Sequence, residues 1–217
     1  MSLRVNIGCG KTPTNEWINL DNSIAIKLAN SKFLYQMAKI LKLLNKDQIE
    51  NIEWNKKNKI IYADVTKKIP LKTSSAECIY TSHMIEHLSR NGVSNFLKEV
   101  LRVLEPKGVL RIAAPDLRII VDSYLNKENA DDFMEQMLVE PMPIGTFRKK
   151  LVLFFSGYRH HQWMYDGKSL CLLLETFGFK KIKICKPGET QIKNYQGLNL
   201  FERAENSVYV EGIKHDN

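Results

Sequence analysis

Two glycines and two carboxylates stand where a nucleotide could be held. Gly8 and Gly10 follow the predicted strand 4–7, and glycine lets the backbone turn sharply and approach a ligand closely. Asp21 ends the next predicted strand, and Asp64 follows the third. Parallel strands end at the same edge of a sheet, so these residues are expected to line one crevice. There Asp21 suits a ribose diol, although it could equally cap the helix that follows it.

Four histidines could accept a proton from a substrate. His83 and His87 follow the predicted strand 76–82, whereas His160 and His161 lie in a later, less regular segment. Histidine titrates near neutral pH, as a general base requires. For His87 a structural hydrogen bond is the alternative interpretation. We expect His160 and His161 to contact the substrate.

His83-x-x-Glu86-His87 also matches the H-x-x-E-H pattern of zinc peptidases, in which two histidines bind the metal and the glutamate activates water. Here the motif directly follows a strand of a nucleotide-binding sheet and is not inside a long helix. The peptidase interpretation also gives no role to the two glycines or the two aspartates. We therefore expect no metal site.

The elements that must position these residues follow from the apolar spacing. Strands are expected at 4–7, 17–20, 59–63, 76–82, 109–114, 180–185 and 207–213, and helices at 24–44, 93–104 and 166–177. The connection between the first two strands is too short for a normal crossover helix. This alternation predicts an α/β doubly wound fold.

We expect one domain over 1–217, with an insertion at about 117–165. The insertion contains a Pro- and Gly-rich stretch and an amphipathic piece, 147–155. An insertion after the fifth strand lies over the carboxyl edge of the sheet, where it would serve as a substrate lid.

Composition limits the partners. The chain has 217 residues, a net charge of +8 and four scattered cysteines, without a signal peptide or an apolar run of membrane-spanning length. We expect a cytoplasmic protein with free thiols. The lysine-rich regions 27–59 and 146–193 favour an anionic partner, or are simply a solvated surface. The lysine-flanked stripe of 24–44 would pack on the sheet or rest on an anionic membrane.

The chain resembles the class I S-adenosylmethionine-dependent methyltransferases over nearly its whole length. The stretches that carry the resemblance are VNIGCGK, INLDNS, YADVTKKIP, YTSHMIEHL, FLKEVLRVLEPKGVLRIAAPD and, more loosely, LLLETFGFKKIKI. The resemblance implies a Rossmann-like, mostly parallel sheet of seven strands, with the last strand antiparallel. The first crossover helix is expected to be shortened, which departs from the family pattern. It also implies that S-adenosylmethionine is the cofactor.

Site roles follow from the same resemblance. The residues that it places at the cofactor are Asn6, Gly8, Cys9, Gly10, Asp21, Asp64, Val65, Thr81, Ser82 and His83. The glycine turn would face the methionine part, Asp21 the ribose and Asp64 the adenine amino group. Besides the short crossover, two residues depart from the family pattern: Asn6, where an acid is usual, and Thr12, where a third glycine is usual.

The expected reaction is methyl transfer to an oxygen or nitrogen of a small-molecule, glycan or lipid-precursor substrate. Because the sulfonium makes the methyl group electrophilic, the protein mainly binds, aligns and excludes water. Two alternatives stay open: an NAD-dependent oxidoreductase, and a catalytically inactive cofactor-binding or partner module. The sequence has no RNA-binding motif, so a nucleic-acid partner is not expected.

Overall fold

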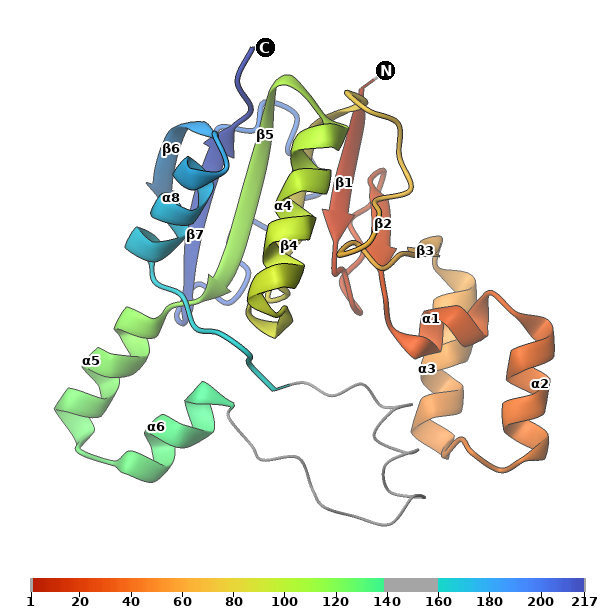
Figure 1. Ribbon diagram of the computed structural model, residues 1–217. Helices are drawn as coiled ribbons and strands as arrows, with labels where there is room; N and C mark the ends of the chain where they lie inside the picture. Colours follow the sequence, from red (N-terminus) through yellow and green to blue (C-terminus); the bar gives the residue numbers. More distant parts are fainter. Residues whose placement is uncertain (1, 139–159, 217) are drawn as a thin grey trace.

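The structure, a computed structural model, describes residues 2–138 and 160–216. Its centre is a seven-stranded sheet of order β3-β2-β1-β4-β5-β7-β6 (Figure 1). The strands are β1 (Leu3–Ile7), β2 (Ile18–Asp21), β3 (Ile60–Tyr62), β4 (Ala76–Ser82), β5 (Leu104–Pro115), β6 (Lys180–Cys185) and β7 (Ser207–Ile213). Strands β1 to β5 run parallel, and β7 is antiparallel to both of its neighbours. The predicted fold class and strand count are confirmed.

The helices flank this sheet. They are α1 (Ile24–Ala29), α2 (Lys32–Ile40), α3 (Lys46–Lys57), α4 (Arg90–Val103), α5 (Leu117–Lys127), α6 (Ala130–Met137) and α8 (Gly167–Thr176), with a short 3₁₀ helix, η1 (Ile85–His87). As expected, no helix connects β1 and β2. Helix α8 is capped as predicted, because the Asp166 side chain accepts a hydrogen bond from the Ser169 N–H.

The predicted single helix over 24–44 is wrong. The chain breaks at Asn30 and Ser31, where Asn30 ends α1 and the Ser31 side chain caps α2. Helix α3, which the sequence analysis did not predict, completes a group of three helices with its own apolar cluster: Leu28, Tyr35, Ala38 and Ile52. The outer side of α2 therefore does not pack on the sheet.

Two further boundaries differ from the prediction. Strand β5 starts at Leu104 and not at 109, because Leu104 already pairs with Ala76 of β4. The insertion is more regular than expected at its start, since α5 and α6 pack together through Tyr124 and Phe133, whose ring centroids are 5.2 Å apart. The predicted amphipathic piece 147–155 lies outside the described residues.

The two faces of the sheet are covered differently. On one face, α4 and α8 bury a large apolar core that includes Phe96, Val100 and Leu174. On the other face the cover is the non-helical segment 186–206, whose Leu198 and Leu200 belong to the cluster around the sheet tyrosines. That segment replaces the helices that usually cover the second face of a doubly wound sheet.

A buried ion pair fastens segment 186–206 to the sheet. Arg111 of β5 and Glu211 of β7 are fully buried, and Arg111 Nη1 lies 2.6 Å from Glu211 Oε1. The same arginine donates to the Glu189 carbonyl, and Glu211 accepts from the Thr190 hydroxyl and the Gln191 N–H. A charged pair at this depth is stable only when such additional hydrogen bonds are present.

Candidate active site

The strand ends bring the predicted site residues to one edge. In the sheet register Ile7 pairs with both Leu20 and Thr81, so the carboxyl ends of β1, β2 and β4 lie side by side. The residues that follow these positions are Gly8, Asp21 and Ser82. This is the edge at which α/β sheets bind nucleotide ligands.

The glycine turn has the geometry that the sequence predicts. Gly8 and Gly10 have φ angles of +71° and +51°, in the left-handed region that favours glycine. A Cβ on Gly8 would lie 2.8 Å from Cγ of Met84, whereas a Cβ on Gly10 would meet no atom within 4 Å. The N–H groups of Gly8 and Cys9 both donate to the Leu20 carbonyl, at 2.8 and 3.3 Å. Strand β2 thus holds the turn, and open space remains beside Gly10.

Asp21 links the turn to the start of α1. Its Oδ2 accepts from the Gly10 N–H at 3.0 Å, and its Oδ1 accepts from the Ser23 N–H at 2.7 Å. The second contact is with the N-cap residue of α1. A carboxylate offers about four lone-pair sites, so acceptor capacity remains for a diol.

Asp64, unlike Asp21, has side-chain partners within its own turn. Its Oδ1 accepts from the hydroxyl and the N–H of Thr66, and its Oδ2 lies 2.9 Å from Lys67 Nζ. The Thr66 hydroxyl first, and Lys67 in addition, hold the pKa of Asp64 below its usual value. The adjacent Val65 is buried. Asp64 is therefore an ionised acceptor whose role toward an adenine amino group stays a prediction.

Asn6 and Cys9 lie under the turn. The Asn6 amide donates to the Thr14 hydroxyl at 2.9 Å and to the Thr12 carbonyl at 3.3 Å, so it holds the chain that replaces a crossover helix. Cys9 packs with Ile26 and other buried residues, and burial raises the pKa of its thiol to about 12. Both side chains position the turn in this structure.

A polar atom without a partner lies beside the turn. Thr81 is fully buried, and its Oγ1 has no hydrogen-bond partner among the described residues. This oxygen lies 3.9 Å from the Cβ position that a side chain at Gly8 would have. With the Asp21 carboxylate and the space beside Gly10, the groups present fit a nucleoside that carries a polar tail.

The histidines divide into two groups. His83, with φ of +48°, has its Nε2 2.8 Å from the Ser207 hydroxyl and its Nδ1 3.2 Å from Arg203 Nη1, so both ring nitrogens have polar partners. The other three lie where the insertion returns to η1. The His87 Nδ1–H donates to the His160 carbonyl at 3.0 Å, and the rings of His87 and His161 have centroids 5.1 Å apart.

Backbone contacts fix the returning chain on η1. The Gln162 N–H donates to the Glu86 carbonyl at 2.8 Å, and the Gln162 side chain donates to the His87 carbonyl, also at 2.8 Å. Burial lowers the pKa of His161, an effect that Glu86 opposes, so His161 is neutral near pH 7. Glu86 itself is fully buried. The sequence analysis did not assign it to the site, although it is part of the motif quoted there.

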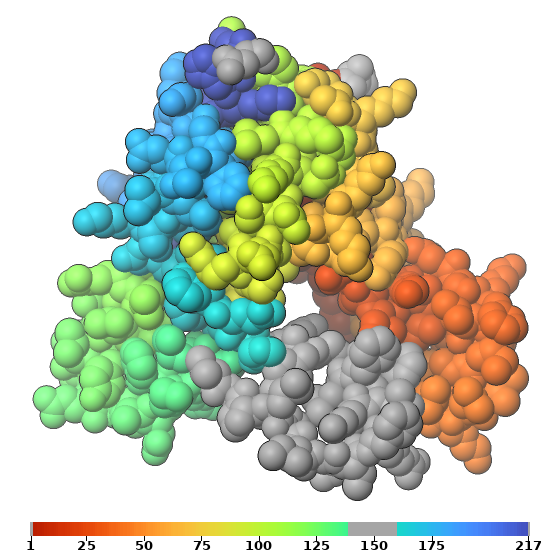
Figure 2. All heavy atoms as spheres, in the orientation of Figure 1, coloured from red at the N-terminus to blue at the C-terminus, as the bar shows by residue number. Residues whose placement is uncertain are grey.

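Beside this edge the described residues leave an opening (Figure 2). In Figure 2 an opening separates the helices α1 to α3 from the segment that begins at residue 160. A different hollow, of about 550 Å³, lies at the opposite edge, near the starts of β4, β5 and β6. Its rim carries five lysines, namely Lys107, Lys180, Lys181, Lys193 and Lys214. The lysine-rich surface predicted for 146–193 is thus partly remote from the glycine turn.

Comparisons with known proteins identify the fold and the family. Residues 5–112 match a family model described as "Methyltransferase domain". A solved S-adenosylmethionine-dependent methyltransferase from Methanosarcina mazei has a TM-score of 0.52 at 13% identity, covering 100% of this chain and 93% of that chain. A possible histamine N-methyltransferase from Thermotoga maritima has a TM-score of 0.50 at 14% identity, covering 99% and 83%. At such identities the solved structures show the fold alone.

Comparison with curated proteins gave no significant match. Among the described residues, no helix has both the length and the apolar character needed to cross a membrane.

Proposed function

This chain belongs to the class I S-adenosylmethionine-dependent methyltransferases, and we propose that it methylates an oxygen or nitrogen of a small-molecule, glycan or lipid-precursor acceptor. One observation carries the proposal. The Asp21 carboxylate and the glycine turn are hydrogen-bonded to each other at the same sheet edge at which the histidines gather. Cofactor groups and proton-accepting groups therefore converge on one edge.

The residues have separable roles. The cofactor, when bound, supplies a methyl group on an electrophilic sulfonium, so alignment and exclusion of water are the main tasks of the protein. Asp21 accepts hydrogen bonds from the ribose, and the Thr81 hydroxyl serves the methionine end. Where the acceptor must lose a proton, one of the candidates His83, His87, His160 and His161 takes it. The four free cysteines support a reducing compartment, the cytoplasm.

Calorimetry tests the cofactor and the alternatives together. Purified protein is titrated separately with S-adenosylmethionine, S-adenosylhomocysteine and NAD. We expect binding of both sulfur nucleotides and none of NAD. A response to NAD alone would support the oxidoreductase that the sequence left open. Binding without methylation of any acceptor would support a catalytically inactive module.

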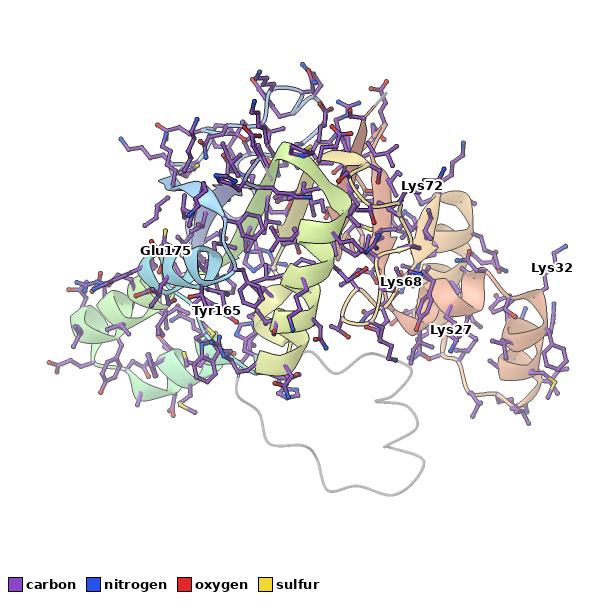
Figure 3. The ribbon with its side chains drawn as sticks, turned by 45° about the horizontal axis from the view of Figure 1, so that its top comes forward. Lys27, Lys32, Lys68, Lys72, Tyr165 and Glu175 are labelled. Atoms are coloured by element: carbon purple, nitrogen blue, oxygen red, sulfur yellow. The ribbon has the colours of Figure 1, made fainter. Side chains whose placement is uncertain are left out.

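The surface of α2 favours an acceptor at a lipid surface. Phe33 and Ile40 are 72% and 71% exposed, and Leu34, Met37 and Leu41 are also exposed. Exposed lysines of the same stretch surround this apolar face. Figure 3 shows Lys27 and Lys32, from α1 and α2, on the same side of the molecule as Lys68, from the segment between β3 and β4. An apolar face with a basic border is typical of helices that lie on anionic membranes.

Vesicle binding is expected to depend on this face. The double variant Phe33→Ser/Ile40→Ser should lose more than about tenfold in affinity for phosphatidylserine-containing vesicles, because each buried apolar side chain contributes about 1.5–3 kcal/mol. Co-sedimentation measures the loss, with pure phosphatidylcholine vesicles as the uncharged comparison. Leu172→Ser, on α8, is the matched control, since Leu172 is 63% exposed but lies elsewhere. Equal binding by the double variant and this control would contradict the proposal.

A further inference from the structure

Glu86 has an unusual environment for a carboxylate. Its side chain is fully buried, and neither oxygen has a hydrogen-bond partner among the described residues. The nearest groups that could carry a positive charge are His83 Nδ1 and His87 Nε2, at 3.6 and 3.8 Å from Oε1. Both distances exceed that of a hydrogen bond. Since a buried carboxyl group without hydrogen-bond partners is strongly disfavoured inside a protein, this one calls for a partner that the described residues do not supply.

The hydrogen bond of His87 fixes its tautomer. The His160 carbonyl can only accept, so Nδ1 of His87 carries the ring proton. In the neutral ring Nε2 then presents a lone pair, and this lone pair lies 3.8 Å from Glu86 Oε1. Two acceptors thus face each other, the Glu86 carboxylate fully buried and the His87 side chain 30% exposed. Donation of the second ring N–H to a backbone carbonyl is also the usual arrangement of a metal-binding histidine.

His161 adds a third group. Its Nδ1 is buried and has no hydrogen-bond partner among the described residues. One ligand atom each from Glu86, His87 and His161 lie within 4.8 Å of one another. Ligand atoms about 2.0–2.2 Å from a tetrahedral zinc ion are roughly 3.3–3.6 Å apart, so small side-chain rotations would bring these three to that spacing.

We propose that Glu86, His87 and His161 form a binding site for a divalent transition-metal ion such as Zn²⁺. The first two residues come from η1, and the third is held against them by the backbone contacts of Gln162. Two imidazoles and one carboxylate suit Zn²⁺ and similar ions better than Ca²⁺ or Mg²⁺, which prefer oxygen ligands. Three protein ligands leave a position for an oxygen or nitrogen of the methyl acceptor, a role that rests on the proposed function.

This site differs from the peptidase motif considered in the sequence. In that motif His83 would be a ligand and Glu86 would activate water. Here both ring nitrogens of His83 have partners in Ser207 and Arg203, and Glu86 itself joins the ligand set. The third ligand, His161, lies far along the chain, and only the fold brings it to the other two.

The test is a titration of metal-free protein with zinc chloride by calorimetry, in the absence of S-adenosylmethionine. Chelator-treated and dialysed wild type should bind one Zn²⁺ per chain. Glu86→Gln and His161→Ala should each weaken binding by more than about 100-fold, beyond the 10–100-fold expected from loss of an outer-shell contact. His215→Ala is the matched control, because His215 is exposed and outside the cluster, and it should bind like wild type.

Thermal unfolding supplies a second measurement. Zn²⁺ should raise the unfolding midpoint of wild type and leave that of Glu86→Gln unchanged. Without metal, Glu86→Gln should unfold at or above the wild-type midpoint, because it removes a buried charge without a partner. Such a result would also show that the variant is folded.

Two results would overturn the metal site: no Zn²⁺ binding by wild type, or equal binding by Glu86→Gln. In either case Glu86 is not a metal ligand. Titration of the metal-free protein with S-adenosylmethionine keeps the two proposals separate. Cofactor binding without Zn²⁺ binding rejects only the metal site, and Zn²⁺ binding without cofactor binding rejects only the proposed function.

Discussion

Asp21→Ala is expected to weaken S-adenosylmethionine binding by about 100-fold or more. The carboxylate would accept both ribose hydroxyls, and a hydrogen bond to a charged group contributes about 1.5–3 kcal/mol. Each 1.4 kcal/mol corresponds to about a tenfold change in affinity. The substitution also removes the acceptor of the Gly10 N–H, so the turn loses a support. Calorimetric titration measures the loss.

Two variants make this result specific. Asp21→Asn keeps the shape and one carbonyl acceptor, so its affinity should fall between those of Asp21→Ala and wild type. Asp122→Ala removes a partly exposed carboxylate whose ion pair, among the described residues, is with Arg118 at the surface, and it should bind the cofactor normally. Unchanged affinity in Asp21→Ala would mean that the ribose is not held at the end of β2.

Arg111→Met should lower the free energy of unfolding by about 3–5 kcal/mol, the largest stability effect that we expect. The reason is that Glu211 would keep a buried charge without its cation, which is the usual cost of breaking a buried pair. The hydrogen bond to the Glu189 carbonyl would be lost as well, so the hold on segment 186–206 would weaken. Urea denaturation followed by circular dichroism measures the change.

The double variant Arg111→Met/Glu211→Leu separates charge from packing. It should be more stable than Arg111→Met alone, because no unpaired charge remains in the core. Arg118→Met is the surface control and should unfold like wild type, since the Arg118 side chain is exposed and its partner Asp122 is partly exposed. If Arg111→Met and Arg118→Met have the same stability, the buried pair does not hold the sheet face as described.

The sheet could be predicted because its strands carry local signals. Strand β4, Ala76–Ser82, has the predicted bounds, and α8 starts at the predicted cap, Asp166. The three helices α1 to α3 were harder to predict from the sequence. The apolar spacing of 24–44 continues across Asn30 and Ser31, so periodicity alone cannot show the break. Helix α3 is mostly polar and is stabilised by its capping box and by Ile52, which the other two helices cover.

The meeting of Gly8, Asp21 and Thr81 at one sheet edge could also be predicted, because each lies at or directly after the carboxyl end of a strand. Gly8 and Asp21 need only the rule that parallel strands end together. Asn6 was assigned to the cofactor by resemblance, whereas its amide holds Thr14 in this structure. That contact depends on the path of the connection after the turn, which has no periodic signal.

The acceptor side depends on contacts between distant segments. Glu86 lies near His161 because Gln162 is hydrogen-bonded to η1. No local sequence pattern predicts these hydrogen bonds. The same is true of Arg111 and Glu211, which look like isolated charges within two apolar strands. Such pairs become visible only once the strand order and the path of the insertion are known.

The Leu20 carbonyl accepts two hydrogen bonds from the glycine turn, and these bonds hold the turn in place for ligand recognition. Since the Gly8 and Cys9 N–H groups are already tied to β2, the turn is preorganised before any nucleoside arrives. The loop loses its conformational entropy when the protein folds, so this loss does not weaken ligand binding. Affinity on this side of the protein is therefore set by shape and hydrogen-bond matching, with little contribution from induced fit.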